Sequence, residues 1–138
     1  MEQIASIEQI FPALTWRIRQ LAMYPDKEII DMELPEDWDG IHFGLYYQYE
    51  LTGVVSLFMN GNSAQFRKMA VLPSQQGKGF GLQLLKYLID YCKHQNMKNL
   101  WCNARVSAIG FYKKIGFQTV GEPYERNQLQ YVKMEFTF

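Results

Sequence analysis

The sequence predicts an α/β fold in which helices flank a mixed, mostly antiparallel sheet of about six to seven strands. Apolar residues recur with a period of two between residues 41 and 72, which indicates consecutive strands. They then recur at helical spacing over residues 79–94, after which short strand-like runs return. A chain of 138 residues can bury one core but is too short for two, so residues 1–138 predict a single domain.

The N-terminal part predicts a short element, a helix and a variable loop. The first apolar residues have helical spacing, with Ser6 and Gln9 placed like a capping box. Because Pro12 interrupts this pattern, we expect a first helical turn or a short strand, followed by a helix near residues 14–23. Residues 25–40 are acidic, contain two prolines and predict a loop with room for one helical turn.

Three consecutive strands follow in a meander. Residues 41–49 alternate between an apolar and a more polar face, whereas residues 52–59 are apolar on both faces and predict a central strand. Asn60–Ser63 has the composition of a hairpin turn, so the run 65–72 should return antiparallel. The third strand therefore delivers the chain to a glycine-rich segment.

The second half of the chain predicts two helices and three further strands. The strand after the long helix should run parallel to its predecessor through a β-α-β crossover, and Gly116 suits the end of the short helix. The predicted bounds are 79–94 for the long helix, 99–104 for the buried strand, 107–115 for the short helix, and 117–121 and 129–136 for a hairpin whose loop covers 122–127.

Composition excludes several classes of function. The 14 basic and 14 acidic residues balance, so neither nucleic acid nor an anionic membrane is an expected partner. The apolar runs are too short to span a membrane and the first residues lack a signal-peptide pattern, which predicts a cytoplasmic protein. Cys92 and Cys102 predict buried, reduced thiols. His42 and His94 have no metal-binding spacing, so no metal is expected.

The segment Gln76-Gly-Lys-Gly-Phe-Gly81 joins the third strand of the meander to the long helix. Alternating glycines expose backbone N–H groups, and a helix N-terminus adds unpaired donors and a partial positive charge. This combination predicts a pyrophosphate-binding loop. The spacing matches neither the G-x-G-x-x-G dinucleotide fingerprint nor the P-loop.

Two segments together resemble a known family. Gln76–Gly81 reads Q-x-x-G-x-G, which resembles the acetyl-CoA-binding motif of the GNAT acyltransferase superfamily. Asn103–Phe117 is similar to that family's later N-x-x-A-x-x-F-Y-x-x-x-G-F block, with two extra residues between the Asn and the Ala, and the two segments have the family's order and about its separation. The resemblance implies the GNAT fold and an N-acetyltransferase. Such an enzyme moves the acetyl group of acetyl-CoA to an amine by direct attack in a ternary complex.

The resemblance also implies roles for particular residues. The strand before the glycine loop would hold the pantetheine arm, polarise the thioester carbonyl and splay from the next strand. Tyr112 would protonate the departing thiolate. The implied cofactor-binding residues are Met69, Ala70 and Val71 of that strand, Gln76, Gly77, Lys78, Gly79, Phe80 and Gly81 of the loop, and Asn103.

The general base and the acceptor stay open. Many family members have Glu where this chain has Gln65, which cannot accept a proton. His42, Glu125, Tyr131 and ordered water are the alternatives, as is an acceptor of low pKa. The acceptor could be a small amine or a protein amine, and a homodimer is compatible with the sequence. The missing carboxylate also keeps open a non-catalytic module that binds acyl-CoA as a sensor.

Overall fold

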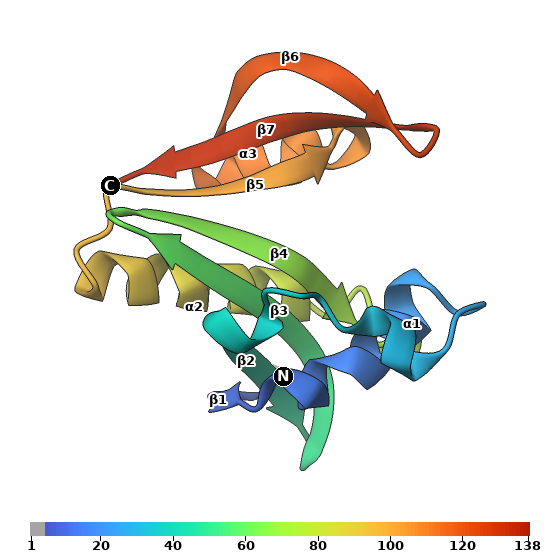
Figure 1. Cartoon of the computed structure of the whole chain (residues 1–138). Helices are drawn as coiled ribbons and strands as arrows, with labels where there is room; N and C mark the ends of the chain where they lie inside the picture. Colours follow the sequence, from blue (N-terminus) through green and yellow to red (C-terminus); the bar gives the residue numbers. More distant parts are fainter. Residues whose placement is uncertain (1–4) are drawn as a thin grey trace.

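A single mixed sheet in the order β1-β2-β3-β4-β5-β7-β6 runs through the computed structural model, which describes residues 5–138 (Figure 1). The strands are β1 Ser6–Ile10, β2 Ile41–Tyr47, β3 Glu50–Asn60, β4 Ser63–Val71, β5 Asn99–Arg105, β6 Gln118–Arg126 and β7 Leu129–Thr137. The α-helices are α1 Trp16–Met23, α2 Phe80–His94 and α3 Ile109–Ile115. Short 3-10 segments are η1 Pro12–Thr15, η2 Ile29–Met32, η3 Asp37–Asp39, η4 Pro73–Gln75 and η5 Val106–Ala108. The predicted fold class is confirmed.

The predicted meander is present as β2, β3 and β4, each antiparallel to the next. The β3–β4 connection is a tight turn in which Asn60 pairs with Ser63 and Gly61 has φ of +62°. The β2–β3 turn lies one residue earlier than predicted, with Gln48 and Tyr49 both in the left-handed region. Left-handed residues match the twist of the flanking strands, which explains why both turns are so short.

β4 and β5 are parallel neighbours but pair over a short stretch only. The register joins Ser63–Gln65 to Asn99–Trp101, and no further pairs follow within the described residues. Figure 1 shows the two strands close together near the C-terminus and apart at their other ends. The splay that the family resemblance implied is therefore confirmed.

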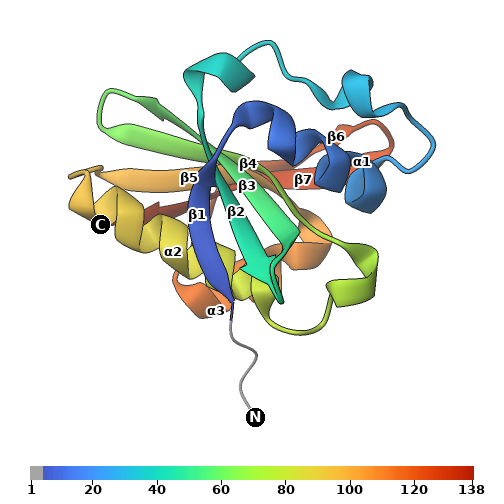
Figure 2. The same cartoon turned by 90° about the horizontal axis from the view of Figure 1, so that it is seen from below.

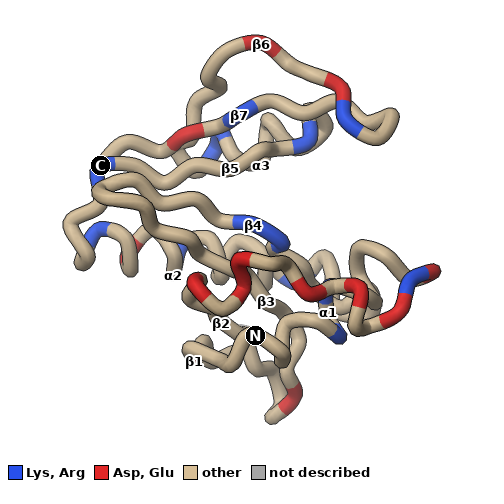
Figure 3. Tube along the Cα trace, viewed as in Figure 1, with Lys and Arg blue, Asp and Glu red and all other residues tan. Residues whose placement is uncertain are grey.

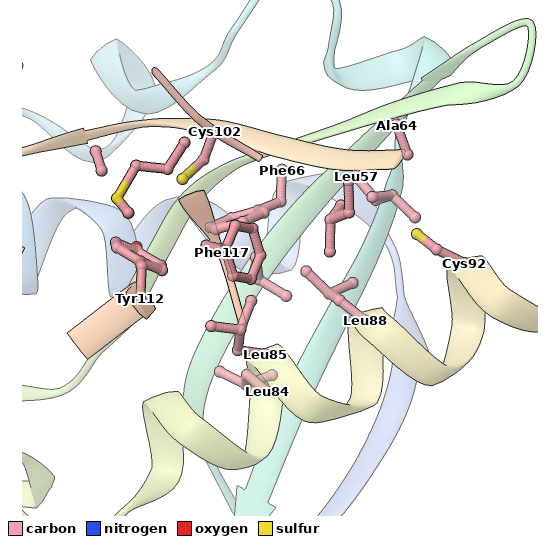
Figure 4. Packing of buried hydrophobic residues seen from close by; sticks show 14 of the residues in the cluster. Leu57, Ala64, Phe66, Leu84, Leu85, Leu88, Cys92, Cys102, Tyr112 and Phe117 are labelled. Carbon is pink, nitrogen blue, oxygen red and sulfur yellow. The ribbon is translucent and has the colours of Figure 1, made fainter. Parts of the chain in front are cut away.

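Each face of β3 packs against a different helix, which explains why this strand is apolar on both sides. Val54 packs with Ile18 of α1, whereas Val55 belongs to a larger cluster with Leu84 and Leu88 of α2 (Figure 4). Figure 2 shows α2 and α3 together on one side of the sheet and α1 on the other. β3 is therefore covered on one face by α1 and on the other by α2.

The ends of α2 and α3 have the same backbone geometry. Gly116 has φ of +119°, its N–H bonds to the carbonyl of Lys113, and the N–H of Phe117 bonds to the carbonyl of Tyr112. This Schellman arrangement, which the sequence predicted at Gly116, satisfies carbonyls that a helix end leaves unpaired. Asn96 ends α2 in the same way. The stop at Gly116 fixes where Tyr112 lies on α3.

Two sequence expectations need correction. Ser6 and Gln9 do not cap a helix but belong to β1, which pairs with β2, because Pro12 removes a donor and the helix begins only after it. Residues 122–127 are not a loop, because β6 continues to Arg126 through a bulge between Val120 and Tyr124. The bulge absorbs Gly121 and Pro123, and the turn shrinks to two left-handed residues at 127–128.

Candidate active site

A cleft opens where β4 and β5 separate. One cavity of about 400 Å³ lies within the gap, and a second of about 210 Å³ lies towards α1 and the β6–β7 turn. Both are lined by Met23, Phe66, Arg67, Lys68, Asn103 and Tyr131. We call these two joined cavities the β4–β5 cleft and the smaller one its acceptor side. The gap cavity also contacts Met69, Cys102, Ala104, Arg105, Ser107, Ala108 and Tyr112.

The cleft wall contributed by β4 contains a bulge. Val54 pairs with Ala70 and Ser56 pairs with Arg67, so Val55 alone opposes both Lys68 and Met69. Lys68 has φ of +55°, a costly conformation for a residue with a side chain. Such bulges redirect backbone and side chains, and they are common next to active sites. Met69 lies within the bulge, whereas Ala70 and Val71 follow it and pair with β3 alone within the described residues.

The glycine loop follows β4 directly and ends at the first turn of α2. Gly77 and Gly79 have φ of +82° and +84°, and a Cβ built on either glycine would have no atom within 4 Å. Gly81, in the first helical turn, is equally open. Gly79 is the N-cap of α2 and has no side chain to accept hydrogen bonds from the first amides of the helix, which are therefore available to a ligand. The geometry fits a bound anion against bare backbone.

The side chains of the remaining loop residues make contacts within the protein. The Gln76 amide donates to the carbonyl oxygen of Val71 at 3.0 Å, which ties the loop back to β4. Lys78 donates to Gln75 at 2.7 Å and lies 5.3 Å from the ring centroid of Tyr47. Phe80 is buried against Tyr47, so only its backbone could face a ligand.

Asn103 lies on β5 where this strand borders the cleft, opposite Lys133 of β7. Its side chain does not cap the helix that follows. The N-caps there are Arg105 for η5 and Ala108 for α3, neither with a side-chain cap bond. Asn103 is therefore exposed to the cleft and contacts both cavities.

Tyr112 lies at the inner end of the gap cavity. It is 9% exposed, and its ring packs against Phe66, Phe111 and Phe117 at centroid distances of 5.1–6.1 Å. Burial, together with the neighbouring Cys102 thiol, raises the pKa of the phenol well above its usual value. Figure 4 shows the two side chains at the same end of the core cluster. Tyr112 is thus a protonated hydroxyl beside the cleft at neutral pH.

Cys102 contributes the thiol beneath the same cavity. It is 2% exposed, and burial raises its pKa to about 12, partly opposed by its hydrogen bond with Tyr112. The thiol stays protonated at physiological pH and is a poor nucleophile in that form. Cys92 is buried within the α2 core, and neither cysteine forms a disulfide, as the sequence predicted.

His42 lies in a buried network rather than in the cleft. Its Nε2 is 2.7 Å from the carbonyl oxygen of Asp37, which can only accept, so its Nδ1 accepts from the Ser56 hydroxyl at 2.7 Å. Arg19 in turn donates to Ser56 at 2.8 Å and to both carboxylate oxygens of Asp37. Burial lowers the pKa of His42. With both nitrogens bonded and 1% exposure, His42 is not accessible to an acceptor amine.

The other base candidates lie nearer the acceptor side. Gln65 and Tyr131 line it, and Tyr131 stacks on Tyr124 with ring centroids 6.0 Å apart. Glu125 is exposed on β6 opposite Gln130 and does not contact either cavity. The sequence interpretation did not identify Tyr24, Arg105 and Arg126 as cleft residues. Of these three residues, only Arg126 has a sequence feature that could have indicated its position, because Asn127 next to it is a common hairpin-turn residue.

The described part of the chain has neither a candidate metal site nor a candidate membrane-spanning helix. Residues 5–138 contain no group of three or more His, Cys, Asp and Glu side chains that could hold a metal ion. They also contain no helix that is both long enough and apolar enough to cross a membrane.

Comparison with known proteins identifies the family. Residues 24–138 match the family model described as an acetyltransferase (GNAT) domain. The chain is 27% identical over 120 residues to the uncharacterized N-acetyltransferase YitI of Bacillus subtilis, with 80% of each chain covered. It is 30% identical over 121 residues to a [ribosomal protein bS18]-alanine N-acetyltransferase of Haemophilus influenzae, covering 86% of this chain and 75% of that one.

A solved structure gives the same fold. The GNAT family acetyltransferase from Elizabethkingia anophelis with acetyl-CoA bound superposes with a TM-score of 0.76 at 23% identity, covering 97% and 98% of the two chains. The family model and the relatives named N-acetyltransferase favour an enzyme over a non-catalytic sensor. The chain belongs to the GNAT acetyltransferases, and it is an acetyltransferase.

Proposed function

We propose that this protein transfers the acetyl group of acetyl-CoA to a primary amine by direct attack within a ternary complex. The proposal rests above all on the way β4 leads directly into the glycine loop. The unpaired edge of β4 leads into an open anion-binding loop at the N-terminus of a 15-residue helix. An extended molecule with a diphosphate at one end and a thioester at the other suits this shape.

The residues of β4 and β5 would hold the pantetheine arm. Met69, Ala70 and Val71 have one edge without a strand partner among the described residues, so their backbone groups there can bond to amides of a ligand. Asn103 would contribute from β5 across the gap. N–H groups at the bulge would stabilise negative charge on the thioester oxygen, an effect commonly worth about 3 kcal/mol per donor.

The glycine loop would bind the diphosphate through backbone N–H groups of Gln76–Gly81. The left-handed Gly77 and Gly79 and the first amides of α2 surround open space that a Cβ would occupy. Lys78 would add charge after leaving its weak contact with Gln75, because both side chains are exposed or half-buried. Bound acetyl-CoA would supply the activated acetyl thioester.

Tyr112 would act as the general acid. Its phenol is protonated at neutral pH and lies at the inner end of the gap cavity. With acetyl-CoA and the amine bound, Tyr112 would donate its proton to the departing sulfur and regain one from solvent. Cys102, protonated and buried beside it, gives no support to a covalent acetyl-enzyme intermediate.

Initial-rate kinetics test this proposal. CoA release would be followed with a thiol reagent across a panel of amines, at several concentrations of acetyl-CoA and of the best acceptor. We expect intersecting double-reciprocal lines, and Cys102→Ala should retain them with an activity within about threefold of wild type. Parallel lines that Cys102→Ala abolishes would establish a covalent route instead. Acetyl-CoA binding without CoA release from any amine would contradict acetyl transfer to amines. The homodimer and the cytoplasmic location stay predictions.

A further inference from the structure

The acceptor side of the cleft is lined by cations. Arg67 and Lys68 of β4 and Arg126 of β6 line this cavity, and Arg105 of β5 lines the adjoining one. None of the residues lining either cavity is Asp or Glu. Figure 3 shows basic residues on β4 at the point where the strands part and on the β6–β7 turn opposite. The positive charges thus come from different strands and converge on one opening.

Few carboxylates neutralise these charges. The ion pairs among residues 5–138 are Arg19–Asp37, which is buried elsewhere, and Arg67–Glu36. The Arg67–Glu36 pair is partly exposed, with side-chain exposures of 31% and 40%, so water screens it and a ligand can compete for Arg67. Lys68 instead donates to the Tyr24 hydroxyl at 3.1 Å and lies over that ring. Lys68 and Arg126 therefore leave the acceptor side with an excess of positive charge.

The acidic segment of residues 26–39 borders a different cavity. Asp31 lines it together with Lys27, Lys68 and the buried, paired Arg19. Within this segment, Glu36 contacts the acceptor side through its ion pair with Arg67 and does not line the cavity itself. A cationic acceptor would therefore have to pass from a mixed surface into a positive one. An anionic group would meet Lys68 and Arg126, which form no ion pair among the described residues.

We propose that the natural acceptor is a small amine that also carries an anionic group, with a free amino acid as the chemical class. This inference rests on the proposed acetyl transfer. Arginine binds carboxylates through two parallel hydrogen bonds, and Arg126 stands at the rim of a cavity of about 210 Å³, a size that suits one small molecule. Polyamines and lysine-rich peptides would be repelled.

The same charges would favour deprotonation of the acceptor amine, a step in which Gln65 cannot act as a base. A nearby positive charge disfavours the ammonium form, so Arg67, Lys68 and Arg126 would lower the pKa of a bound amine. The ammonium would lose one proton to water, the neutral nitrogen would form the C–N bond and then lose a second proton to water, and the C–S bond would break. Tyr112 would protonate the sulfur and be reprotonated from solvent. The site would thus replace a basic side chain with an electrostatic field.

Matched acceptors test this inference. Each amino acid would be compared with its own carboxamide, which keeps the amine and side chain but removes the charge, and with a triamine. The carboxamide has the less basic amine, so a site that selects only for neutral amine would prefer it. We expect kcat/KM for the best amino acid to exceed that of its carboxamide by at least about tenfold, and turnover of the triamine to be lower still.

Variants locate the effect. Arg126→Gln should reduce the ratio of kcat/KM between amino acid and carboxamide by about tenfold, whereas Arg126→Lys should keep most of it. Lys93→Gln removes one exposed positive charge on the last turn of α2, away from the cleft, and should leave the ratio unchanged. Added salt should lower the wild-type ratio, because screening weakens exposed charges.

The outcomes separate the two proposals. Equal or faster turnover of the carboxamide or the triamine, or a ratio that Arg126→Gln does not change, would overturn the anionic-acceptor inference and leave acetyl transfer intact. If the protein binds acetyl-CoA in calorimetry but none of the acceptors in the panel causes CoA release, both the anionic-acceptor inference and the proposed acetyl transfer are overturned. A charge preference that Lys93→Gln reduces as much as Arg126→Gln would assign it to overall charge and also overturn the inference.

Discussion

At the scale of single residues, the cleft would separate Tyr112, the proposed acid, from the attacking amine. The Tyr112 hydroxyl is buried beside Cys102, where low polarity keeps both groups protonated. The acceptor side is more open and charged, with Gln65 and Tyr131 on its wall. A proton can therefore be supplied at the inner end of the gap while another is lost to water at the outer end.

Tyr112→Phe should lower kcat about 10²-fold or more, because it removes the proposed proton donor and keeps the ring. The KM for acetyl-CoA and the melting temperature should change little, since Phe66, Phe111 and Phe117 would still enclose an aromatic side chain. Steady-state kinetics would measure this. Tyr131→Phe, the other tyrosine of the gap cavity, is the matched control and should cost less than about threefold. A similarly small loss for Tyr112→Phe would exclude it as the acid.

The pH profile should show that no side chain of the cleft acts as a strong base. From pH 7 towards 9, kcat/KM should rise about tenfold per unit until the free amine has lost its proton. The rise in kcat should level off at a lower pH, because the cations of the acceptor side lower the pKa of the bound amine. Gln65→Glu places a carboxylate on the same wall and should flatten the kcat/KM profile. A wild-type profile that is flat above pH 7 for a basic amine would reveal a base that we have not identified.

At the scale of elements, the proposed cofactor site combines two departures from regular structure. The bulge at Lys68 follows the point where β4–β5 pairing ends, and the left-handed Gly77 and Gly79 open the loop before α2. Neither departure is required for sheet pairing or helix packing. Regular β4–β5 pairing would fill the edge that a ligand needs.

Gly79→Ala should weaken CoA binding by at least about tenfold, because the Cβ would enter the space where the diphosphate would lie. The substitution should also cost about 1–2 kcal/mol of unfolding free energy, the usual penalty for a side chain in the left-handed region. Gly61→Ala at the β3–β4 turn, with φ of +62° and equally open surroundings, is the matched control. It should lose similar stability and keep CoA affinity in calorimetry. Equal affinity in both variants would remove the loop from the cofactor site.

At the scale of the whole molecule, a buried polar network positions one wall of the cleft. Arg19 of α1, Asp37 of η3, Ser56 of β3 and His42 of β2 are joined by hydrogen bonds of 2.7–2.9 Å. The network anchors α1, whose last residue, Met23, lines both cavities. Protonation of His42 would place a second cation beside Arg19 and remove the acceptor that Ser56 uses. The wall of the cleft is therefore coupled to the charge of one histidine.

Stability should fall in mild acid. The pKa of His42 is lowered in the folded state, so its contribution is fully present above the unfolded value near 6.5 and is lost as pH falls from there towards the folded pKa. The slope should approach about 1.4 kcal/mol per pH unit in urea unfolding between pH 7 and 5. His42→Gln should remove this slope, whereas the same change at the exposed His94 should retain it. An unchanged slope in His42→Gln would show that other groups cause the loss.

The acid limit set by Asp37 lies lower. Burial alone would raise its pKa, but hydrogen bonds from Arg19 and Leu34 outweigh burial and bring the pKa below its usual value of 3.8. Its contribution is therefore present above that value and is lost only as pH falls through the lowered one. This loss begins below about pH 3.8, whereas the loss caused by His42 already begins near pH 6.5.

Local sequence patterns were sufficient for the order of the elements. The period of two, the turn at Asn60–Ser63, the glycines of the loop and the stop at Gly116 act through the backbone of neighbouring residues, so they can be interpreted from the chain alone. The resemblance of two segments added the family and the splay between β4 and β5, which the register bears out. The positions of Tyr112 and Asn103 at the cleft followed from those segments.

Contacts between distant segments decided the rest. His42 looks like a base candidate in the sequence, but it is bonded to Ser56 and to the Asp37 carbonyl in the interior. The continuation of β6 to Arg126 depends on its pairing with β7, and that pairing brings Arg126 to the same cavity as Lys68. Balanced composition conceals this local excess of positive charge. Burial, pKa and electrostatic potential depend on three-dimensional neighbours, which only the tertiary structure brings together.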